Sequence, residues 1–188
     1  MLTTPRLLLR HWRDEDLEPL AAMTADPMVM RYFGRIRDRA QSDAWAGRVR
    51  AHIEKHGFGI WALEVPGVAP FIGFVGLSTV PSDLPMAPAV EAVWTLNAPF
   101  WRRGYASEAA RVAMDDGFTR LGLLEIVAYT AAVNAPSRGV MERLGMRRDA
   151  AGDFDHPRVP EGSEFRPHVL YRIRAKSAGP SSAQGSPP

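Results

Sequence analysis

The sequence lacks cysteine and long apolar runs, and each absence removes a class of protein. Its 188 residues include no cysteine, which excludes disulfides, thiol nucleophiles and cysteine-ligated zinc. No run approaches the roughly 18 apolar residues of a membrane span, and the first residues lack the pattern of a secretory signal. We therefore expect a cytoplasmic protein with no membrane partner.

Lysine is scarce as well, because the basic residues are almost all arginine. Lysine occurs only at Lys55 and Lys176, and the 23 basic residues barely outnumber the 21 acidic ones. The short arginine runs are interleaved with acids, whereas a nucleic-acid binder more often gathers its basic charge into a stripe. We expect no nucleic-acid partner, and a nucleic-acid-binding protein is only a minor alternative.

Familiar catalytic and binding motifs are absent or fail on their context. There is no G-x-S-x-G and no Walker A sequence. Residues 57–62 fit G-x-G-x-x-A, but they lead into a predicted strand rather than a helix, which argues against a dinucleotide site. His52 and His56 have the i, i+4 spacing of metal ligands, yet no third ligand is evident,. We predict an exposed helix face there and no metal site.

The order of the predicted elements indicates a mixed α/β or α+β sheet with helices packed on it. β-branched and aromatic residues between turn signals predict strands at 6–12, 60–65, 71–80, 90–96, 125–130 and 169–173. Caps and apolar spacing predict helices from Asp14 to about 25, at 43–56 after a Ser42 cap, and at 106–121 and 135–144.

The remaining segments are expected to be irregular. Residues 81–88 are rich in proline, 149–167 are polar with Pro and Gly, and 28–40 have no clean period, so that the last of these is either a loop or a poorly formed helix. The Ser-, Pro- and Gly-rich end at 177–188 should be disordered. We therefore expect one domain at 1–176, long enough to bury a core.

The stretch from 90 to 121 carries the most informative pattern. A predicted strand is followed by a basic loop containing Gly104, and then by a helix whose small residues recur every three or four positions. A helix start offers free backbone N–H groups and the positive end of its dipole to an anion. Gly104 lets a phosphate approach the backbone, while Arg102 and Arg103 add positive charge. We predict a phosphate cradle at this strand-to-helix turn.

Three motifs together resemble the GNAT superfamily of N-acetyltransferases, in the branch that includes the Rim-type ribosomal-protein N-terminal acetyltransferases. The family's loop, often W-G-K-G-Y-A-x-E-A in this branch, is matched by W-R-R-G-Y-A-S-E-A at 101–109. Its N-x-x-S-x-x-V-x-x-x-L-G-F element is matched at 134–146, and its opening T-x-R-L-x-L-R at 4–10. The resemblance spans almost everything from 2 to 173.

The resemblance implies a GNAT fold and acetyl-CoA (coenzyme A) as the acetyl donor. In this fold a mixed, mostly antiparallel sheet, flanked by helices, splays apart between its fourth and fifth strands. The pyrophosphate would lie on the N–H groups of the basic loop, and the pantetheine arm would pair with the splayed strand. The implied cofactor-binding residues are Leu96, Trp101, Arg102, Arg103, Gly104, Tyr105, Ala106, Ser107, Asn134 and Ser137.

Asn134 has two candidate roles. The resemblance implies that it bonds the pantetheine arm. Its place just before a predicted helix suits a helix cap equally well, and the sequence leaves both roles open.

The implied reaction is direct acetyl transfer to an amine, which must lose a proton before it attacks a thioester. Glu91 is the candidate base, acting through a water, because a carboxylate within an apolar strand is costly unless it is paired or near solvent. The alternative is a strand-edge carboxylate paired with an arginine. The Trp94 N–H would polarise the thioester carbonyl.

Two positions depart from the family pattern. Met141 stands where many GNAT enzymes carry a tyrosine general acid, so the thiolate must take its proton from water or another group, or leave without an acid. The branch's E-x-G-Y-W becomes E-A-V-W at 91–94, which alters the acceptor side of the strand.

The acceptor is expected to be a peptide or protein N-terminus or a small amine. It would bind between residues 28–40, including Phe33, and the loop around Phe154 and His156; a lone loop histidine is more often structural than catalytic. The alternative function is a non-catalytic acyl-CoA sensor, which would keep the Gly104 cradle and be indifferent to Glu91. The sequence leaves open whether the protein is a monomer or a homodimer.

Overall fold

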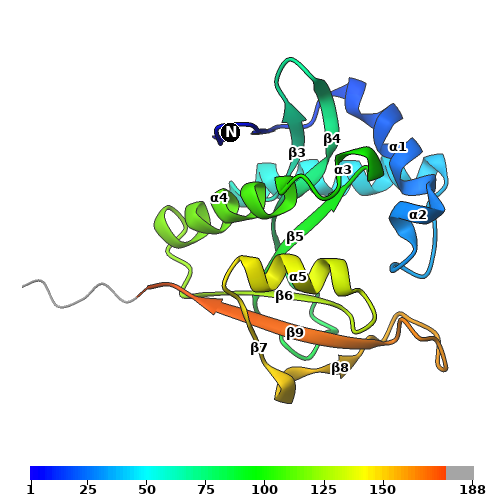
Figure 1. Ribbon diagram of the computed structural model, residues 1–188, viewed down its shortest axis with the longest axis vertical. Helices are drawn as coiled ribbons and strands as arrows, with labels where there is room; N and C mark the ends of the chain where they lie inside the picture. The colour runs from blue at the N-terminus through cyan, green and yellow to red at the C-terminus, as the bar shows by residue number, and fades with distance from the viewer. Residues whose placement is uncertain (177–188) are drawn as a thin grey trace, which may run out of the picture.

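A nine-stranded sheet runs through the described part of the molecule (Figure 1). The computed structural model describes residues 1–176, and the tail expected to be disordered, 177–188, lies outside them. The strand order is β1-β2-β3-β4-β5-β6-β9-β7, and β8 pairs with β9. The strands are β1 Leu2–Thr3, β2 Leu8–Arg10, β3 Ile60–Val65, β4 Ala69–Thr79, β5 Val90–Leu96, β6 Glu125–Ala131, β7 Arg147–Arg148, β8 Phe154–Asp155 and β9 Pro167–Arg174.

Helices cover both faces of this sheet. They are α1 Leu17–Ala25, α2 Pro27–Met30, α3 Arg39–His56, α4 Tyr105–Thr119 and α5 Ala135–Arg143. In β4, the ring of Phe74 lies 4.5 Å from that of Trp45 in α3, whereas a Cβ placed on Gly117 of α4 would lie 2.7 Å from Leu77. Because residues 74 and 77 point to opposite faces of a strand, α3 and α4 lie on opposite faces.

The sheet separates between β5 and β6 (Figure 1). Within residues 1–176, these two strands are the only parallel neighbours, and they share the single register pair Glu91↔Val127. From Glu91 towards Leu96 the strands diverge, so the second half of β5 has a neighbour on one side only. This arrangement confirms the expected mixed, mostly antiparallel sheet with a splay.

Two predicted helix caps are wrong. Asp16, rather than Asp14, is the residue before α1, and a short 3₁₀ turn at Asp14–Asp16 precedes the helix. The Asp16 carboxylate accepts the Arg13 N–H at 2.8 Å. Ser42 lies inside α3, and the residue that caps this helix is Asp38. The Asp38 carboxylate accepts the Gln41 N–H at 2.8 Å. The Gln41 side chain reaches back to the Asp38 N–H, and this reciprocal capping box satisfies two donors, which a lone serine cannot do.

The strands at the chain ends also differ from the prediction. The expected strand 6–12 is shortened to β2 and is preceded by β1, while the last strand begins earlier, at Pro167. The short strand β8 lies within the segment 149–167, which was expected to be irregular, and β7 lies just before that segment, where no strand was predicted. These pieces pair with β9, and such long-range pairing leaves little local signal.

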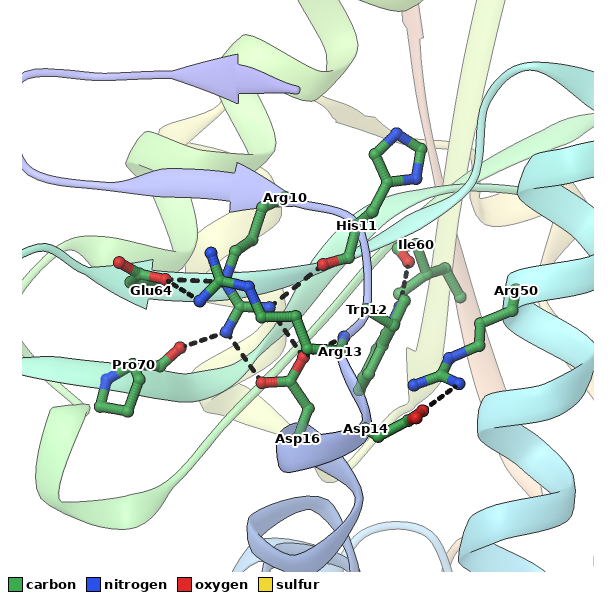
Figure 2. A network of polar contacts seen from close by, with 10 residues as sticks. All are labelled: Arg10, His11, Trp12, Arg13, Asp14, Asp16, Arg50, Ile60, Glu64 and Pro70. Atoms are coloured by element: carbon green, nitrogen blue, oxygen red, sulfur yellow. Dashed lines mark hydrogen bonds and ion pairs between the residues drawn. The ribbon is translucent and has the colours of Figure 1, made fainter.

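A buried ion-pair network fixes β2 against its neighbours (Figure 2). The Arg10 side chain, 2% exposed, donates to both Asp16 oxygens, at 2.7 and 2.8 Å, and to Glu64 at 2.7 Å. It also donates to the carbonyl oxygens of His11 and Pro70, at 3.1 and 2.5 Å. All five guanidinium donors have acceptors, and the Asp16 carboxylate raises the pKa of Arg10. Complete satisfaction is what makes a buried charge tolerable.

The described residues hold neither a bilayer-spanning helix nor a metal cluster. Within 1–176, no helix has both the length and the apolarity to cross a membrane, and no three metal-ligating side chains gather. Both His52 and His56 were predicted to lie on an exposed helix face, but only His56 is exposed. His52 is partly buried against Phe58, with ring centroids 5.2 Å apart, and burial lowers its pKa.

Candidate active site

The loop between β5 and α4 has the backbone geometry expected of an anion cradle. Arg102 has φ +59° and Gly104 has φ +80°, both in the left-handed region. The chain then enters α4 at Tyr105, so the N–H groups of the first turn have no acceptor within the helix. A Cβ on Gly104 would lie 3.5 Å from the Arg6 guanidinium and would narrow this opening. Free N–H groups at a helix start, reached through a left-handed turn without a Cβ at Gly104, suit the binding of a diphosphate.

Two of the sequence motifs meet at Glu108, in the first turn of α4. Arg6 donates to the Glu108 carboxylate through Nε and Nη2, at 2.7 and 2.5 Å, and the Thr4 hydroxyl donates at 2.5 Å. Burial opposes ionisation of Glu108, but the bonds from Thr4 and Arg6 outweigh it and lower the pKa. Arg6 also donates to the Arg103 carbonyl at 3.1 Å. The acidic residue in the first turn of α4 is therefore neutralised by an arginine that also bonds to the loop.

The second half of β5 turns its peptide groups into the splay. The Asn97 N–H donates to the Ile72 carbonyl of β4 at 2.9 Å. Since antiparallel pairs bond at alternate residues, the peptide groups of Trp94 and Leu96 point the other way, towards β6. The Leu96 carbonyl accepts the Trp101 indole N–H at 2.7 Å, which leaves the Leu96 N–H to a ligand. This edge can accept an extended amide-bearing arm as an added strand.

Asn134 caps α5, which confirms one of its two candidate roles. Its Oδ1 accepts the Ser137 N–H at 3.3 Å, and its Nδ2 donates to the Thr130 hydroxyl at 2.9 Å. The second amide hydrogen is left for another acceptor. At the far end of α5, Arg143 Nε donates to the Ser107 hydroxyl at 3.4 Å, so α5 brings a further guanidinium to the start of α4.

The cradle and the candidate base lie on opposite faces of the sheet. Residues directly opposite each other on neighbouring strands point to the same face. Ala92 lies opposite Leu77, on the face that α4 covers. Glu91 lies opposite Ser78, on the face that α3 covers. A cofactor held by α4 and an amine arriving from the other face would therefore meet in the splay.

The Glu91 carboxyl is matched to proton transfer near neutral pH. Burial raises its pKa from 4.5 to about 7, an effect that a hydrogen bond with Tyr129 and the positive charge of Arg158 partly offset. Arg158 is itself paired with Asp83 at 2.5 Å, so it acts on Glu91 from a distance. This is not the simple arginine-paired carboxylate that was the alternative for Glu91. A base with a pKa near the working pH is efficient.

Phe154 and His156 belong to a cluster of four rings that includes Tyr129 and His168. The His156 and His168 rings are 4.8 Å apart, and Phe154 lies 5.5 Å from His168 and 5.8 Å from Tyr129. Burial lowers the pKa of both histidines. His156 also accepts the Arg158 N–H at 3.2 Å, which favours its structural role over that of a second base.

The two expected walls of the acceptor site reach towards each other. The segment that follows α2 contacts the loop before β9 through Tyr32 and Phe165, whose rings lie 6.5 Å apart; both segments lie beside the opening of the splay (Figure 1). Phe33 is 48% exposed and therefore accessible from solvent. Met141 is 1% exposed and packs in the core.

Four residues around the site were missed from the sequence: Tyr129 and Arg158, which act on Glu91, and Asp83 and His168, which contact Arg158 and Tyr129. Tyr129 lies two residues after Val127, the register partner of Glu91, and so shares its face. The alternation of β6 predicts that face, but only the register reveals that it adjoins Glu91. The other three lie in or next to irregular segments, where no periodic signal exists.

A model of the acetyltransferase (GNAT) domain matches residues 6–147. The chain therefore belongs to the GNAT acetyltransferase family. It is an acetyl-CoA-dependent N-acetyltransferase, and the cradle, the open edge of β5 and the splay fit that cofactor.

Several known proteins are similar to this chain. An uncharacterized N-acetyltransferase, YnaD from Bacillus subtilis, is 28% identical over 177 residues, which cover 92% of this chain and 95% of that protein. The crystal structure of an acetyltransferase from Agrobacterium tumefaciens is 26% identical, covers 93% of this chain and 94% of its own, and has a TM-score of 0.75. Spermidine N-acetyltransferase from Vibrio cholerae, solved with CoA and spermine, shares the fold at 18% identity, with 91% and 96% coverage and a TM-score of 0.71.

Proposed function

We propose that Glu91 is the general base for direct acetyl transfer to the primary amine of a peptide N-terminus or a small molecule, as in Rim-type enzymes. One observation carries this proposal: a partly buried carboxyl with a pKa of about 7 lies where β5 leaves β6, on the face opposite the cradle. Bound acetyl-CoA supplies the thioester.

The remaining residues would hold and polarise the thioester. The N–H groups from Arg102 to Ser107 would bind the diphosphate, and the guanidinium groups of Arg102 and Arg103 would add charge. The N–H of Leu96 and the free amide hydrogen of Asn134 would bond the pantetheine arm. The Trp94 N–H, directed into the splay, would polarise the thioester carbonyl.

The proton balance then follows from Glu91. An amine with a pKa of about 8 to 10 is mostly protonated at neutral pH, so Glu91 would first take one proton from it, through a water, and free its lone pair. The neutral nitrogen would then form the C–N bond as the C–S bond breaks, and the second proton that this nitrogen loses would pass to solvent. Burial and the Glu91 charge raise the pKa of Tyr129, so its hydroxyl stays protonated and can bond the carboxylate. Met141 has no acidic proton and is buried, so the thiolate would take its proton from water.

The Glu91→Gln variant tests the assignment. It should bind CoA like the native protein in a calorimetric titration but lose about 10²- to 10⁴-fold in turnover, the usual contribution of a general base. Glu54→Gln, at an exposed position of α3, is the matched control. Unchanged turnover in Glu91→Gln would exclude Glu91 as the base. CoA binding without transfer to any amine, in the native protein, would favour the sensor.

The location, assembly and domain limits stay predictions. We propose a cytoplasmic enzyme, monomeric or homodimeric, with its catalytic domain at 1–176. Light scattering with and without CoA would establish the oligomeric state.

A further inference from the structure

We infer that the acceptor is a peptide with an acidic side chain a few residues after its N-terminal amine, and that Arg35 and Arg37 bind this side chain. The inference rests on the proposed function, because the amine must reach Glu91. It concerns the segment 31–37 after α2, called here the basic wall, and the face of the sheet on which that segment lies.

The arginines of the basic wall lack acidic partners. Many arginines within 1–176 form ion pairs, but Arg31, Arg35 and Arg37 are in none of them. The Arg37 guanidinium instead lies 5.2 Å from the Trp45 ring, and that of Arg31 lies 5.8 Å from the Trp101 ring. Aromatic contacts of this kind orient a guanidinium but leave its charge uncompensated.

Arg37 is the most perturbed of the three. Burial and the positive charges of Arg35 and Arg48 lower its pKa to about 10. Its own N–H donates to the Thr24 carbonyl at 2.9 Å, which anchors the backbone at this point. An opposite charge within about 4–6 Å stabilises a partly buried cation that lies among like charges. None of the ion pairs of the described residues places a carboxylate on Arg37. A ligand anion would.

The basic wall lies on the same face as Glu91. Arg37 contacts Trp45, whose ring is 4.5 Å from that of Phe74, and Phe74 lies opposite Thr95 of β5. Thr95 and Glu91 are both odd-numbered residues of this strand and share a face. The four residue steps from Glu91 to Thr95 span about 13 Å at 3.3 Å per residue. An extended peptide with its amine at Glu91 would pass Thr95 at roughly its fourth residue, and Arg37 lies beyond Thr95 through the contacts of Phe74 and Trp45.

Two further observations favour a peptide over other amines. Phe33 and Ile36 on the same segment are 48% and 53% exposed, which suits apolar side chains of an extended ligand. Polyamines carry several positive charges, and like-charge contacts oppose binding, so the basic wall disfavours them. A small amino acid is too short to span from Glu91 to Arg37.

The test compares three hexapeptides with a free N-terminal serine and glutamate, glutamine or lysine at the fourth position. For the native protein with saturating acetyl-CoA, kcat/KM should be highest for the glutamate peptide, by about tenfold over glutamine, and this ratio should fall with rising salt because the contact is screened. Arg37→Gln and Arg35→Gln should bring the ratio close to one by raising KM for the glutamate peptide. Arg147→Gln, exposed in the edge strand β7, should leave it unchanged.

Each outcome decides the matter. The inference is overturned if kcat/KM for the lysine peptide equals or exceeds that for the glutamate peptide. It is also overturned if neither Arg35→Gln nor Arg37→Gln changes the glutamate-to-glutamine ratio of kcat/KM. Arg35 is exposed, so its variant remains informative if Arg37→Gln unfolds. Acetylation confined to small amines overturns the peptide acceptor while the proposed function stands. Failure of transfer to every peptide and amine refutes the proposed function, and the inference with it.

Discussion

Replacing Glu91 with glutamine should stabilise the folded protein while it removes activity. A carboxyl whose folded pKa is about 7, against 4.5 ordinarily, binds its proton more tightly in the folded than in the unfolded state. Its contribution to stability is therefore fully present below about pH 4.5 and is lost as the pH rises through 7. At 1.36 kcal/mol per pKa unit, the full cost is at most about 3 kcal/mol, and partial solvation reduces it to about 2.

Urea unfolding of both proteins at several pH values measures this difference. At about pH 8, Glu91→Gln should unfold at a higher midpoint, with an unchanged slope; near pH 4.5 the two midpoints should nearly coincide. In the native enzyme, kcat/KM should rise with pH through about 7 as Glu91 ionises. A variant less stable than the native protein at pH 8, or a stability difference independent of pH, would refute the assignment of a destabilised, functional carboxylate.

Other predictions follow from the geometry. Gly104→Val should abolish micromolar CoA binding. Gly122→Val is the control, because Gly122 has a comparable positive φ of +67° with open space around it, so this variant should share only the backbone strain of about 1–2 kcal/mol. Equal CoA binding by the two variants would exclude the cradle. Arg10→Met leaves the Asp16 and Glu64 carboxylates without their partner and should lower the free energy of unfolding, measured by heat or urea, by about 3–5 kcal/mol. Arg50→Met breaks the surface pair with Asp14 and should lower it by less than about 1 kcal/mol. Asn134→Asp keeps the helix cap but lacks the amide donors, so it should retain stability and weaken CoA binding; unchanged affinity would leave Asn134 with the cap alone.

Local signals predicted the central elements of the fold. Strands 60–65 and 90–96 match β3 and β5 to the residue because turn residues bound both of them. The cradle was predicted for the same reason, since Gly104 and the helix that follows it are adjacent in the sequence. The cap of α3 was missed because Asp38 and Gln41 act as a pair, and the serine is a plausible cap only when considered alone.

Contacts between distant segments account for what the sequence did not reveal. Glu91 could be chosen from its place in an apolar strand, but its raised pKa depends on burial by segments far along the chain. Tyr129 approaches it only through the register of β6, and Arg158 only through its ion pair with Asp83, 75 positions earlier. No spacing rule encodes such pairs. The three arginines of the basic wall were equally invisible, because a surface arginine and an unpaired one look alike in sequence.

The single register pair between β5 and β6 makes the cofactor part of the architecture. The two halves of the sheet lack a shared ladder beyond Glu91, and an amide-bearing arm laid in the gap would act as a removable strand. Since a ligand that binds only the folded state stabilises it in proportion to its own concentration, the supply of acetyl-CoA would govern how often the halves open. Hydrogen exchange and proteolytic lifetime, as well as catalytic rate, should then follow the metabolic state of the cell.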